Sequence, residues 1–205
     1  KNPLTPIQLC AERLARHFQS APPATRALVE ECTRTIVGEV ESLKGLVDEF
    51  SQFARMPAPK RISTSLPTLL ADTLALYVGL FRDVTIVCQP PPDLPLARVD
   101  PEQIRRVIIN LVDNAIEAMD RKGRVDIELQ HAAAERVIRV IVADDGPGIP
   151  AGEREKLFMP YYSTKRRGSG LGLAIVNRIV QEHLGTVRAE DNEPRGARFV
   201  VELPA

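Results

Sequence analysis

A run of alternating glycines opens a helix-like segment at residues 168–176, Gly-Ser-Gly-Leu-Gly-Leu-Ala-Ile-Val. The amino end of a helix carries unpaired N–H groups and the positive end of the helix dipole, and glycines keep side chains out of the way. Three basic residues at 165–167 stand just before the run. The segment therefore predicts a phosphate-binding turn. It is not a P-loop, since Gly-Lys-Ser/Thr is missing, nor a dinucleotide fingerprint, since the spacing is G-x-G-x-G.

Two asparagines lie four residues apart on a helix predicted for residues 101–120. The buried side of this helix is marked by apolar residues at helical spacing, namely Ile104, Ile108, Leu111, Ala115 and Met119. Asn110 and Asn114 therefore share another face, with Glu117 beside them. Carboxamide oxygens at this spacing suit a hard cation such as Mg²⁺, and a solvated helix face explains the pattern equally well.

A third cluster, Asp-Asp-Gly-Pro-Gly at residues 144–148, directly follows a β-rich run. A carboxylate at the end of a strand can accept a hydrogen bond from an exocyclic amine, and Gly146 and Gly148 would let the backbone approach a flat ring. Asp-Gly-Pro-Gly is also the composition of an ordinary turn, so the cluster by itself leaves both readings open.

Residues 158–168 lie between the Asp-Asp-Gly-Pro-Gly cluster and the glycine run. The segment begins with Phe158, Tyr161 and Tyr162 and continues with Ser, Thr, Lys, Arg and Gly. A hinged lid, with an aromatic end that docks and a basic end that meets a ligand, has this composition. A plain surface loop is the alternative.

The first quarter of the chain predicts two long helices. An apolar seam at alternating spacings of three and four runs through residues 4–18, and another runs through residues 29–54. The connection at residues 20–25 holds Pro22 and Pro23, and the sequence Met-Pro-Ala-Pro at 56–59 breaks the second helix. We expect an antiparallel hairpin that pairs with a second copy to form a four-helix bundle. Because the second arm is longer, we also expect the first helix to continue before Lys1.

The rest of the chain mixes helices and strands. Helical periods mark residues 66–81, 101–120 and 171–183, and β-rich runs mark residues 84–89, 125–130, 136–143, 186–190 and 197–203, while prolines at 90–92 and 95 mark a loop. Without regular βαβ alternation, these elements predict an α+β sandwich with helices on one face of a mixed sheet. The expected domains are the hairpin at 1–56, a linker at 57–65 and a second domain at 66–205.

Composition excludes several classes of protein. Lys plus Arg and Asp plus Glu both total 27, so no net charge would hold the chain on nucleic acid. The three cysteines are scattered without a CxxC pair, which argues against disulfides and a zinc site. No apolar run approaches the roughly 18 residues that span a bilayer, so we expect no membrane insertion of this chain and a cytoplasmic location.

In combination, N-x-x-x-N, D-x-G-x-G, an aromatic segment and G-x-G-x-G resemble, in this order, the N, G1, F and G2 boxes of the histidine-kinase ATPase family. The resemblance covers residues 61–205. Lys-Asn-Pro-Leu-Thr-Pro at residues 1–6 looks like the tail of that family's H box. The motif sequences are most similar to those of the nitrogen-regulation sensor kinases, with Asn-Pro-Leu-Thr-Pro-Ile early in the chain and Asn-Ala-Ile-Glu-Ala-Met later.

The resemblance implies roles for individual residues. Asn114 would bind Mg²⁺ with Asn110 beside it, Asp144 would accept from the adenine amino group, and Lys165 would reach the phosphates. The other implied ATP-binding residues are Gly146, Gly148, Tyr162, Gly168, Ser169, Gly170, Leu171 and Gly172. Asn2 matches the position that orients water when a response regulator is dephosphorylated.

Two features depart from the family pattern. Ala197 stands where the family often has Thr or Ser, which puts a hydroxyl near the base in doubt, although Phe199 is kept. The phosphoacceptor histidine would fall three residues before Lys1, so none is expected in this chain. His17, His131 and His183 lack H-box neighbours and are expected to be surface or structural residues.

By resemblance, the function is that of a protein histidine kinase. The intact protein would bind ATP and Mg²⁺, transfer the γ-phosphate to a histidine and then to an aspartate in the receiver domain of a response regulator, with phosphatase activity as a further possibility. A homodimer and a parent anchored in the inner membrane are expected. One rival is an ATP-driven clamp of the gyrase or chaperone type, which uses a glutamate as general base where this helix has asparagines. The other is a non-catalytic dimeric ATP-binding scaffold that docks a response regulator.

Overall fold

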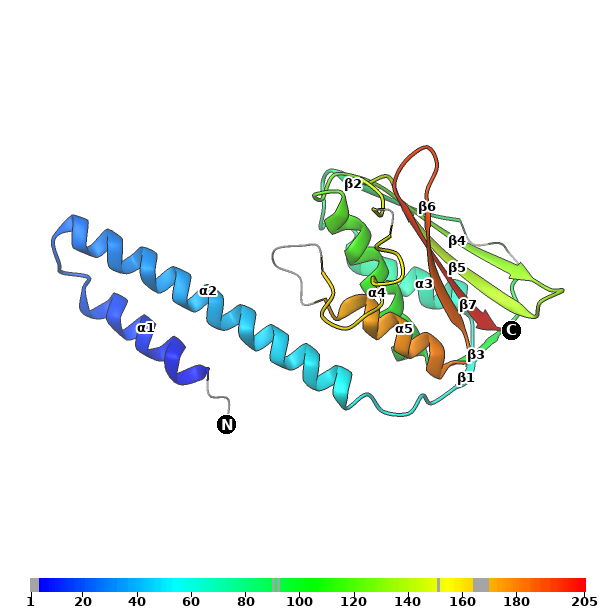
Figure 1. Ribbon diagram of the computed structural model, residues 1–205, viewed down its shortest axis with the longest axis horizontal. Helices are drawn as coiled ribbons and strands as arrows, with labels where there is room; N and C mark the ends of the chain where they lie inside the picture. The colour runs from blue at the N-terminus through cyan, green and yellow to red at the C-terminus, as the bar shows by residue number, and fades with distance from the viewer. Residues whose placement is uncertain (1–3, 90, 92, 151, 164–169) are drawn as a thin grey trace. The chain divides into compact units, whose positions relative to one another are not determined.

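The structure is a computed structural model that describes residues 4–205, except residues 90, 92, 151 and 164–169 and the side chain of Gln52. Contacts divide the chain into two compact units, Lys1–Met56 and Pro57–Ala205. The first is an antiparallel pair of helices, and the second is a mixed sheet with helices on one face (Figure 1). The α+β class expected from the sequence is therefore confirmed.

The helical hairpin consists of α1 (Thr5–His17) and α2 (Pro23–Ala54). Pro22 is the N-cap residue of α2 and Pro23 its first residue, a position at which the missing N–H of proline does no harm. Within the hairpin Ala11 and Val40 are buried, and Thr33 Oγ1 lies 3.4 Å from the carbonyl oxygen of Ala11, to which it donates. These contacts hold the two helices side by side.

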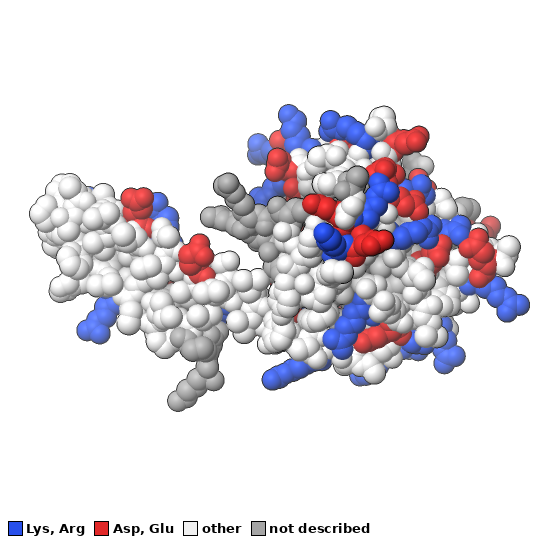
Figure 2. All heavy atoms as spheres, viewed as in Figure 1, with Lys and Arg blue, Asp and Glu red and all other residues white. Residues whose placement is uncertain are grey.

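Much of the apolar seam of the hairpin is open to solvent in a single copy. Five of its large side chains are between 48% and 54% exposed, namely Ile7, Leu14, Leu43, Val47 and Phe50. Figure 2 shows mainly uncharged atoms on the face of the hairpin that it presents. A helical pair with so wide an apolar stripe gains free energy if another surface covers it.

The second unit is built on a five-stranded sheet in the order β2-β4-β5-β7-β6. The strands are β2 (Val84–Cys88), β4 (Gly123–Ala132), β5 (Val137–Asp144), β6 (Thr186–Asp191) and β7 (Ala197–Pro204). Only β2 and β4 run parallel; the other pairs are antiparallel. Three helices, α3 (Leu66–Leu74), α4 (Pro101–Ala118) and α5 (Gly172–Glu182), cover one face of this sheet (Figure 1).

Helix α4 adopts the register that its apolar spacing predicts. Asp100 caps the helix, because its Oδ1 accepts from the N–H groups of Glu102 at 3.0 Å and Gln103 at 3.2 Å. The five apolar residues expected on the buried side are all buried, from Leu111 at 0% to Met119 at 8% exposure. Asn110 and Asn114 are consequently turned to another side of the helix.

One sequence expectation about local structure was wrong, and one pair of strands was not predicted. The helix expected at residues 66–81 ends at Leu74, continues as a 3-10 turn, η1 (Ala75–Tyr77), and gives way to a loop in which Gly79 has φ of +77°. A short antiparallel pair, β1 (Ile62–Thr64) with β3 (Ala97–Val99), was missed. Strands of three residues are too short for an alternating pattern to be recognised.

Among the described residues, none of the helices combines the length and the low charge needed to cross a bilayer.

Candidate functional site

Asp144 forms the centre of a turn at the carboxyl end of β5. Its side chain is 2% exposed, and its Oδ1 accepts from the N–H groups of Gly146 at 2.9 Å and Ala197 at 3.2 Å. These two bonds hold Oδ1 in place. A Cβ on Gly146 would lie 2.8 Å from Asp144 Oδ1, so this position requires glycine. The departure from the family pattern at Ala197 leaves its backbone donor in place.

The connection between β6 and β7 braces this turn from the other side. Asn192 Nδ2 donates to the carbonyl oxygen of Asp144 at 2.9 Å, and Arg195 Nε donates to that of Asp145 at 2.6 Å. A Cβ on Gly196 would lie 1.8 Å from the carbonyl oxygen of Asp144. These partners were missed from the sequence. The only signal was the Asn-Glu-Pro-Arg-Gly run at residues 192–196, which is also an ordinary turn.

Asn110, the first of the two asparagines on α4, lies against the amino end of α5. Asn110 and Asn114 are both half-buried, and Asn110 Oδ1 lies 3.8 Å from the position that a Cβ on Gly172 would occupy. Asn110 Nδ2 is buried and, among the described residues, has no hydrogen-bond partner. The two clusters that are 58 residues or more apart in sequence therefore meet, with a buried polar group at their junction.

The amino end of α5 is suited to an anion. Gly172 is its first residue, and the N-cap residue Leu171 is 1% exposed and makes no capping hydrogen bond with its side chain. Its first N–H groups have no partner within the helix, and the helix dipole makes this end positive.

Described residues at both ends of the segment that precedes α5 make contacts within the second unit. The rings of Phe158 and Phe199 form an edge-to-face pair with centroids 6.5 Å apart. The N–H of Tyr161 donates to the carbonyl oxygen of Gly170 at 3.0 Å, so these two residues lie side by side. Gly170 has φ of +68°. Desolvation, followed by the negative charge of Glu153, raises the pKa of the Tyr162 hydroxyl.

Four of the residues singled out from the sequence, Asn2, Lys165, Gly168 and Ser169, lie outside the described residues. The others lie on three segments: Asn110 and Asn114 on α4, Asp144, Gly146 and Gly148 at and after the end of β5, and Tyr162, Gly170, Leu171 and Gly172 before and at the start of α5.

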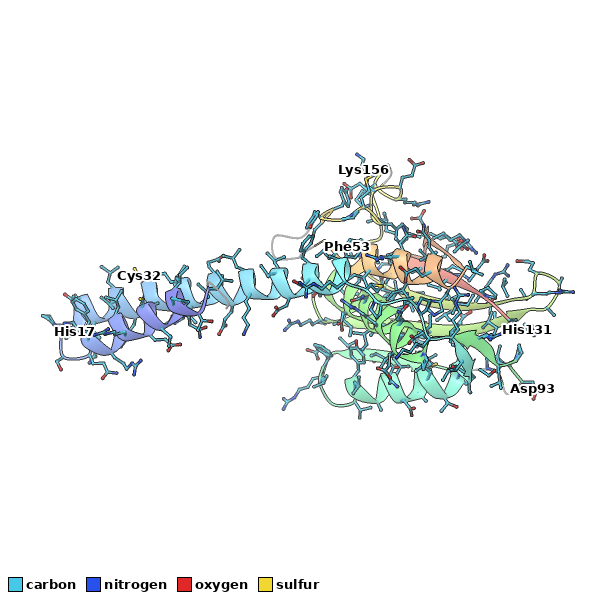
Figure 3. All side chains as sticks on the ribbon, turned by 90° about the horizontal axis from the view of Figure 1, so that it is seen from below. His17, Cys32, Phe53, Asp93, His131 and Lys156 are labelled. Atoms are coloured by element: carbon cyan, nitrogen blue, oxygen red, sulfur yellow. The ribbon has the colours of Figure 1, made fainter. Side chains whose placement is uncertain are left out.

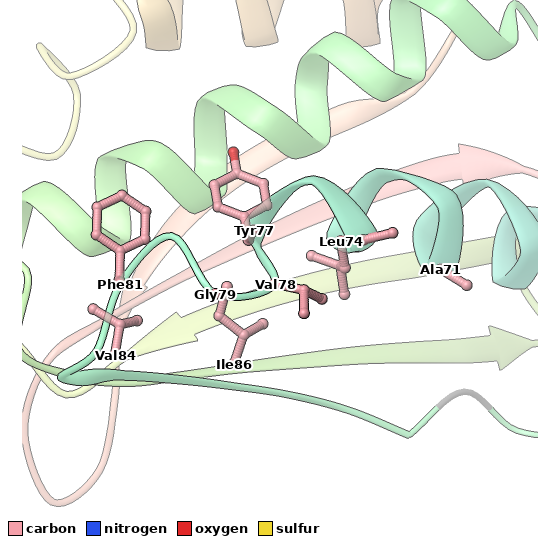
Figure 4. Close-up of a pocket in the computed structure, with 9 residues that line it drawn as sticks. Ala71, Leu74, Tyr77, Val78, Gly79, Phe81, Val84 and Ile86 are labelled. Atoms are coloured by element: carbon pink, nitrogen blue, oxygen red, sulfur yellow. The ribbon is translucent and has the colours of Figure 1, made fainter.

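An apolar pocket lies elsewhere in the second unit. It has a volume of about 450 Å³ and lies between α3, η1 and β2, lined by Leu74, Tyr77, Phe81, Ile86 and their neighbours (Figure 4). Tyr77 Oη donates to Asp113 Oδ1 at 2.7 Å, and burial with this carboxylate raises the pKa of Tyr77. The pocket contains none of the residues singled out above. It also lacks charged lining side chains, so it does not suit a phosphate-bearing ligand.

None of the three histidines belongs to the segments that carry the candidate site residues. His17 lies at the loop end of the hairpin, and His131 lies near the tip of the β4–β5 pair (Figure 3). His183 is 2% exposed, with Nδ1 2.8 Å from the carbonyl oxygen of Ile179 and Nε2 accepting from the N–H of Asp100 at 2.9 Å. His183 is thus a structural residue.

Residues 99–205 match the model of the histidine kinase-, DNA gyrase B- and HSP90-like ATPase family. The chain is 38% identical to nitrogen regulation protein NtrY of Azorhizobium caulinodans, covering all of this chain and 27% of that protein. It is 36% identical to a putative sensor histidine kinase, NtrY-like, of Rickettsia typhi, covering 96% of this chain and 33% of that protein. The chain thus spans about a quarter to a third of these curated relatives.

Solved structures agree with the fold. Full-length ShkA in complex with AMPPNP aligns with a TM-score of 0.75 and 25% identity over 98% of this chain and 43% of that one. Histidine kinase ThkA in complex with response regulator TrrA aligns with a TM-score of 0.75 and 28% identity over 99% of this chain and 57% of that one.

Proposed function

The chain belongs to the histidine kinase-, DNA gyrase B- and HSP90-like ATPase family, and from this premise we propose that it is the ATP-binding and dimerising part of a two-component sensor histidine kinase. Its resemblance to NtrY-type kinases favours this branch over clamp-type ATPases. The N-x-x-x-N pair also favours it, because clamp-type enzymes need a glutamate as general base at that helix. We place the chain on the cytoplasmic side of a membrane-anchored parent.

The observation that carries this proposal is that Asn110 on α4 lies against the amino end of α5, two segments that the sequence predicts to bind the same nucleotide. Helix α4 supplies the amide of Asn110 and α5 supplies its first N–H groups, while the turn with the buried carboxylate of Asp144 packs against the carboxyl end of α4, where a Cβ on Gly146 would lie 3.5 Å from the carbonyl oxygen of Ala118. We propose that Asp144 accepts from the adenine amino group and that Gly146 and Gly148 shape the base pocket. The start of α5, with Gly168, Ser169, Gly170 and Leu171 and with Lys165 and Tyr162, would hold the phosphates.

Residues on α4 fit a magnesium ion. Amide oxygens are hard ligands of the kind that Mg²⁺ accepts, and it keeps several waters that need donors and acceptors nearby. The buried Asn110 Nδ2 has no partner among the described residues, which matches a group whose partner arrives with the nucleotide. We assign Asn114 and Asn110 to this ion. When bound, it would neutralise charge on the phosphates.

The reaction of the intact protein would be in-line phosphoryl transfer. A histidine imidazole nitrogen attacks the γ-phosphorus, the bond to the β-phosphate oxygen breaks, and ADP leaves. Such a reaction depends on positioning and on neutralising charge, which are the tasks that the α5 amino end and the basic lid residues can perform. The acceptor would be the H-box histidine whose tail Lys1 and its neighbours resemble. The next acceptor would be an aspartate of a receiver domain.

We assign the hairpin to dimerisation and to contact with the response regulator. Its exposed seam, including Leu43 and Val47, would be buried against a second copy in a four-helix bundle. Asn2 would orient water if the protein also dephosphorylates its regulator.

Calorimetric titration with ATP, in Mg²⁺ and in EDTA, tests the proposal. We expect one site per chain whose affinity falls in EDTA. Asn114→Ala should weaken binding in Mg²⁺ by about tenfold or more and remove the difference between the two buffers. Asn177→Ala, the same change on α5 away from the proposed ligands, is the control. If the affinity for ATP changes neither with Mg²⁺ nor with Asn114→Ala, the result would favour the non-catalytic scaffold instead.

A further inference from the structure

The short segment that joins the two units is bound along the second unit rather than left free. Residues 57–61 lead from the end of α2 to β1, and Figure 1 shows them as the cyan trace between these elements. The carbonyl oxygen of Pro57 accepts from Gln103 Nε2 at 2.9 Å, and the N–H of Lys60 donates to Asp100 Oδ2 at 2.8 Å. The guanidinium of Arg61 donates to the carbonyl oxygen of Glu182.

The partners of this segment sit at two helix ends. Asp100 and Gln103 form the first turn of α4, while Glu182 is the last residue of α5. His183 ties these two ends together, because its Nε2 accepts from the N–H of Asp100 while its Nδ1 lies 2.8 Å from the carbonyl oxygen of Ile179. With Nε2 as an acceptor, Nδ1 is the nitrogen left to donate to the carbonyl oxygen of Ile179.

The sequence of the segment suits such docking. Pro57 and Pro59 have fixed φ angles and favour an extended backbone, so less conformational entropy is lost when the segment is held in place. From Ile62 the chain continues without interruption into β1, which pairs with β3. Desolvation of the Asp100 carboxyl is outweighed by N–H donors from Lys60, Gln103 and Glu102, and its pKa is lowered.

We infer that residues 57–61 form a strap that belongs to the ATP-binding unit, with Asp100 and His183 as its positioning residues. The pivot between the two units is then confined to Arg55 and Met56, which follow the last residue of α2 and precede the first anchored carbonyl. For the kinase reaction, and resting on the proposed function, a two-residue pivot limits the orientations from which the ATP site can approach a histidine on the other unit.

The strap also joins the two helices at the ends away from the nucleotide. On α5 the proposed phosphate site is at Gly172 and the strap contact is at Glu182. On α4 the strap contacts lie within the first turn, and Asn110 and Asn114 follow two to four turns later. A displacement of the strap would therefore be transmitted to both helices that carry the proposed site.

Trypsin provides a test with an internal reference. The chain offers cleavage after Arg55, in the proposed pivot, and after Lys60 and Arg61, in the strap. In the unaltered protein we expect the first cut in residues 55–61 to come after Arg55. Cleavage at the two strap sites should be slower by about tenfold or more, because proteolysis there requires the strap to open.

The substitution Asp100→Asn tests the bond to the strap separately from the capping of α4. Asparagine caps helices as well as aspartate does, so its Oδ1 can keep the bonds to Glu102 and Gln103. Its Nδ2, however, would replace the oxygen that accepts from Lys60, and two donors would then face each other. Cleavage after Lys60 and Arg61 should become about tenfold faster, the effect of losing one charge-assisted hydrogen bond, while cleavage after Arg55 stays unchanged.

Glu102→Gln removes the same charge from the same helical turn without touching the strap and should leave the pattern as it is. Gln103→Met, which removes the donor to Pro57, should accelerate strap cleavage without altering the cap. Two results would overturn the inference. One is equal cleavage rates after Arg55, Lys60 and Arg61 in the unaltered protein, and the other is a cleavage rate in the strap that Asp100→Asn leaves unchanged. The experiment needs no nucleotide, so its outcome is independent of whether ATP binds.

Discussion

Gly170 accepts the hydrogen bond that joins the two ends of the proposed lid and so closes its base. Replacing it with alanine should weaken ATP binding while the protein stays folded. A Cβ at this position would lie 2.6 Å from the carbonyl carbon of Tyr161 and 2.9 Å from the nitrogen of Tyr162. Both are backbone atoms, so neither can turn aside. The backbone also has φ of +68°, a conformation that costs a residue with a Cβ about 1 kcal/mol or more.

The magnitude follows from these contacts. To make room, the chain must give up the bond from the Tyr161 N–H to the Gly170 carbonyl, which contributes about 1 kcal/mol. With the cost of the left-handed backbone, the closed base is disfavoured by at least about 2 kcal/mol. If only the closed form binds the phosphates, the apparent affinity for ATP falls by about 30-fold.

Gly152→Ala is the matched control. Gly152 has φ of +85°, but a Cβ there would meet no atom within 4 Å. Calorimetric titration of both variants with ATP separates the effect of the clash from that of the backbone conformation. Thermal unfolding should show that both remain folded, since the loop can open locally. An affinity of Gly170→Ala equal to that of Gly152→Ala would refute the closed base as a requirement for binding.

Three further outcomes follow from the structure. Val47→Glu, on the exposed seam of the hairpin, should convert a dimer into a monomer in sedimentation velocity; a dimer that persists would place the interface elsewhere. Phe158→Ala should remove an edge-to-face pair with Phe199 worth about 1 kcal/mol and weaken ATP binding several-fold with little change in unfolding temperature; an unchanged affinity would argue against a docked lid. Hydrogen bonds from Arg139 and Arg188 lower the pKa of Glu202 from 4.5 to about 2. Its contribution to stability is therefore full above pH 4.5 and lost as the pH falls toward 2, so Glu202→Gln should destabilise the protein at pH 7 but not near pH 2, measured by urea unfolding at both.

The parts of the site that the sequence predicted are those encoded by local spacing. The apolar period of α4 placed Asn110 and Asn114 on one side of the helix, and the glycine run indicated that a helix begins there, as α5 does at Gly172. Backbone geometry within a few residues determines both features, so the pattern alone reveals them.

The parts that were missed depend on contacts across the fold. Asn192 holds the Asp144 backbone across 48 residues, and Gln103 holds Pro57 across 46. Neither residue belongs to a sequence pattern from which its partner could be predicted. The end of α3 was missed for another reason: the helical period continues beyond Leu74, but a 3-10 turn and the positive φ of Gly79 redirect the chain toward β2.

Asp144 is the residue through which the proposed site would distinguish adenine from other bases, and its replacement gives the most direct test. Asp144→Asn can keep the bonds that Oδ1 accepts from Gly146 and Ala197, but turns the second oxygen into a donor. The unaltered chain should bind ATP in preference to GTP, and Asp144→Asn should lose about tenfold or more of its ATP affinity in calorimetric titration while remaining folded. A chain that binds no ATP, or a folded Asp144→Asn variant that binds it as well as the original, would contradict the proposal.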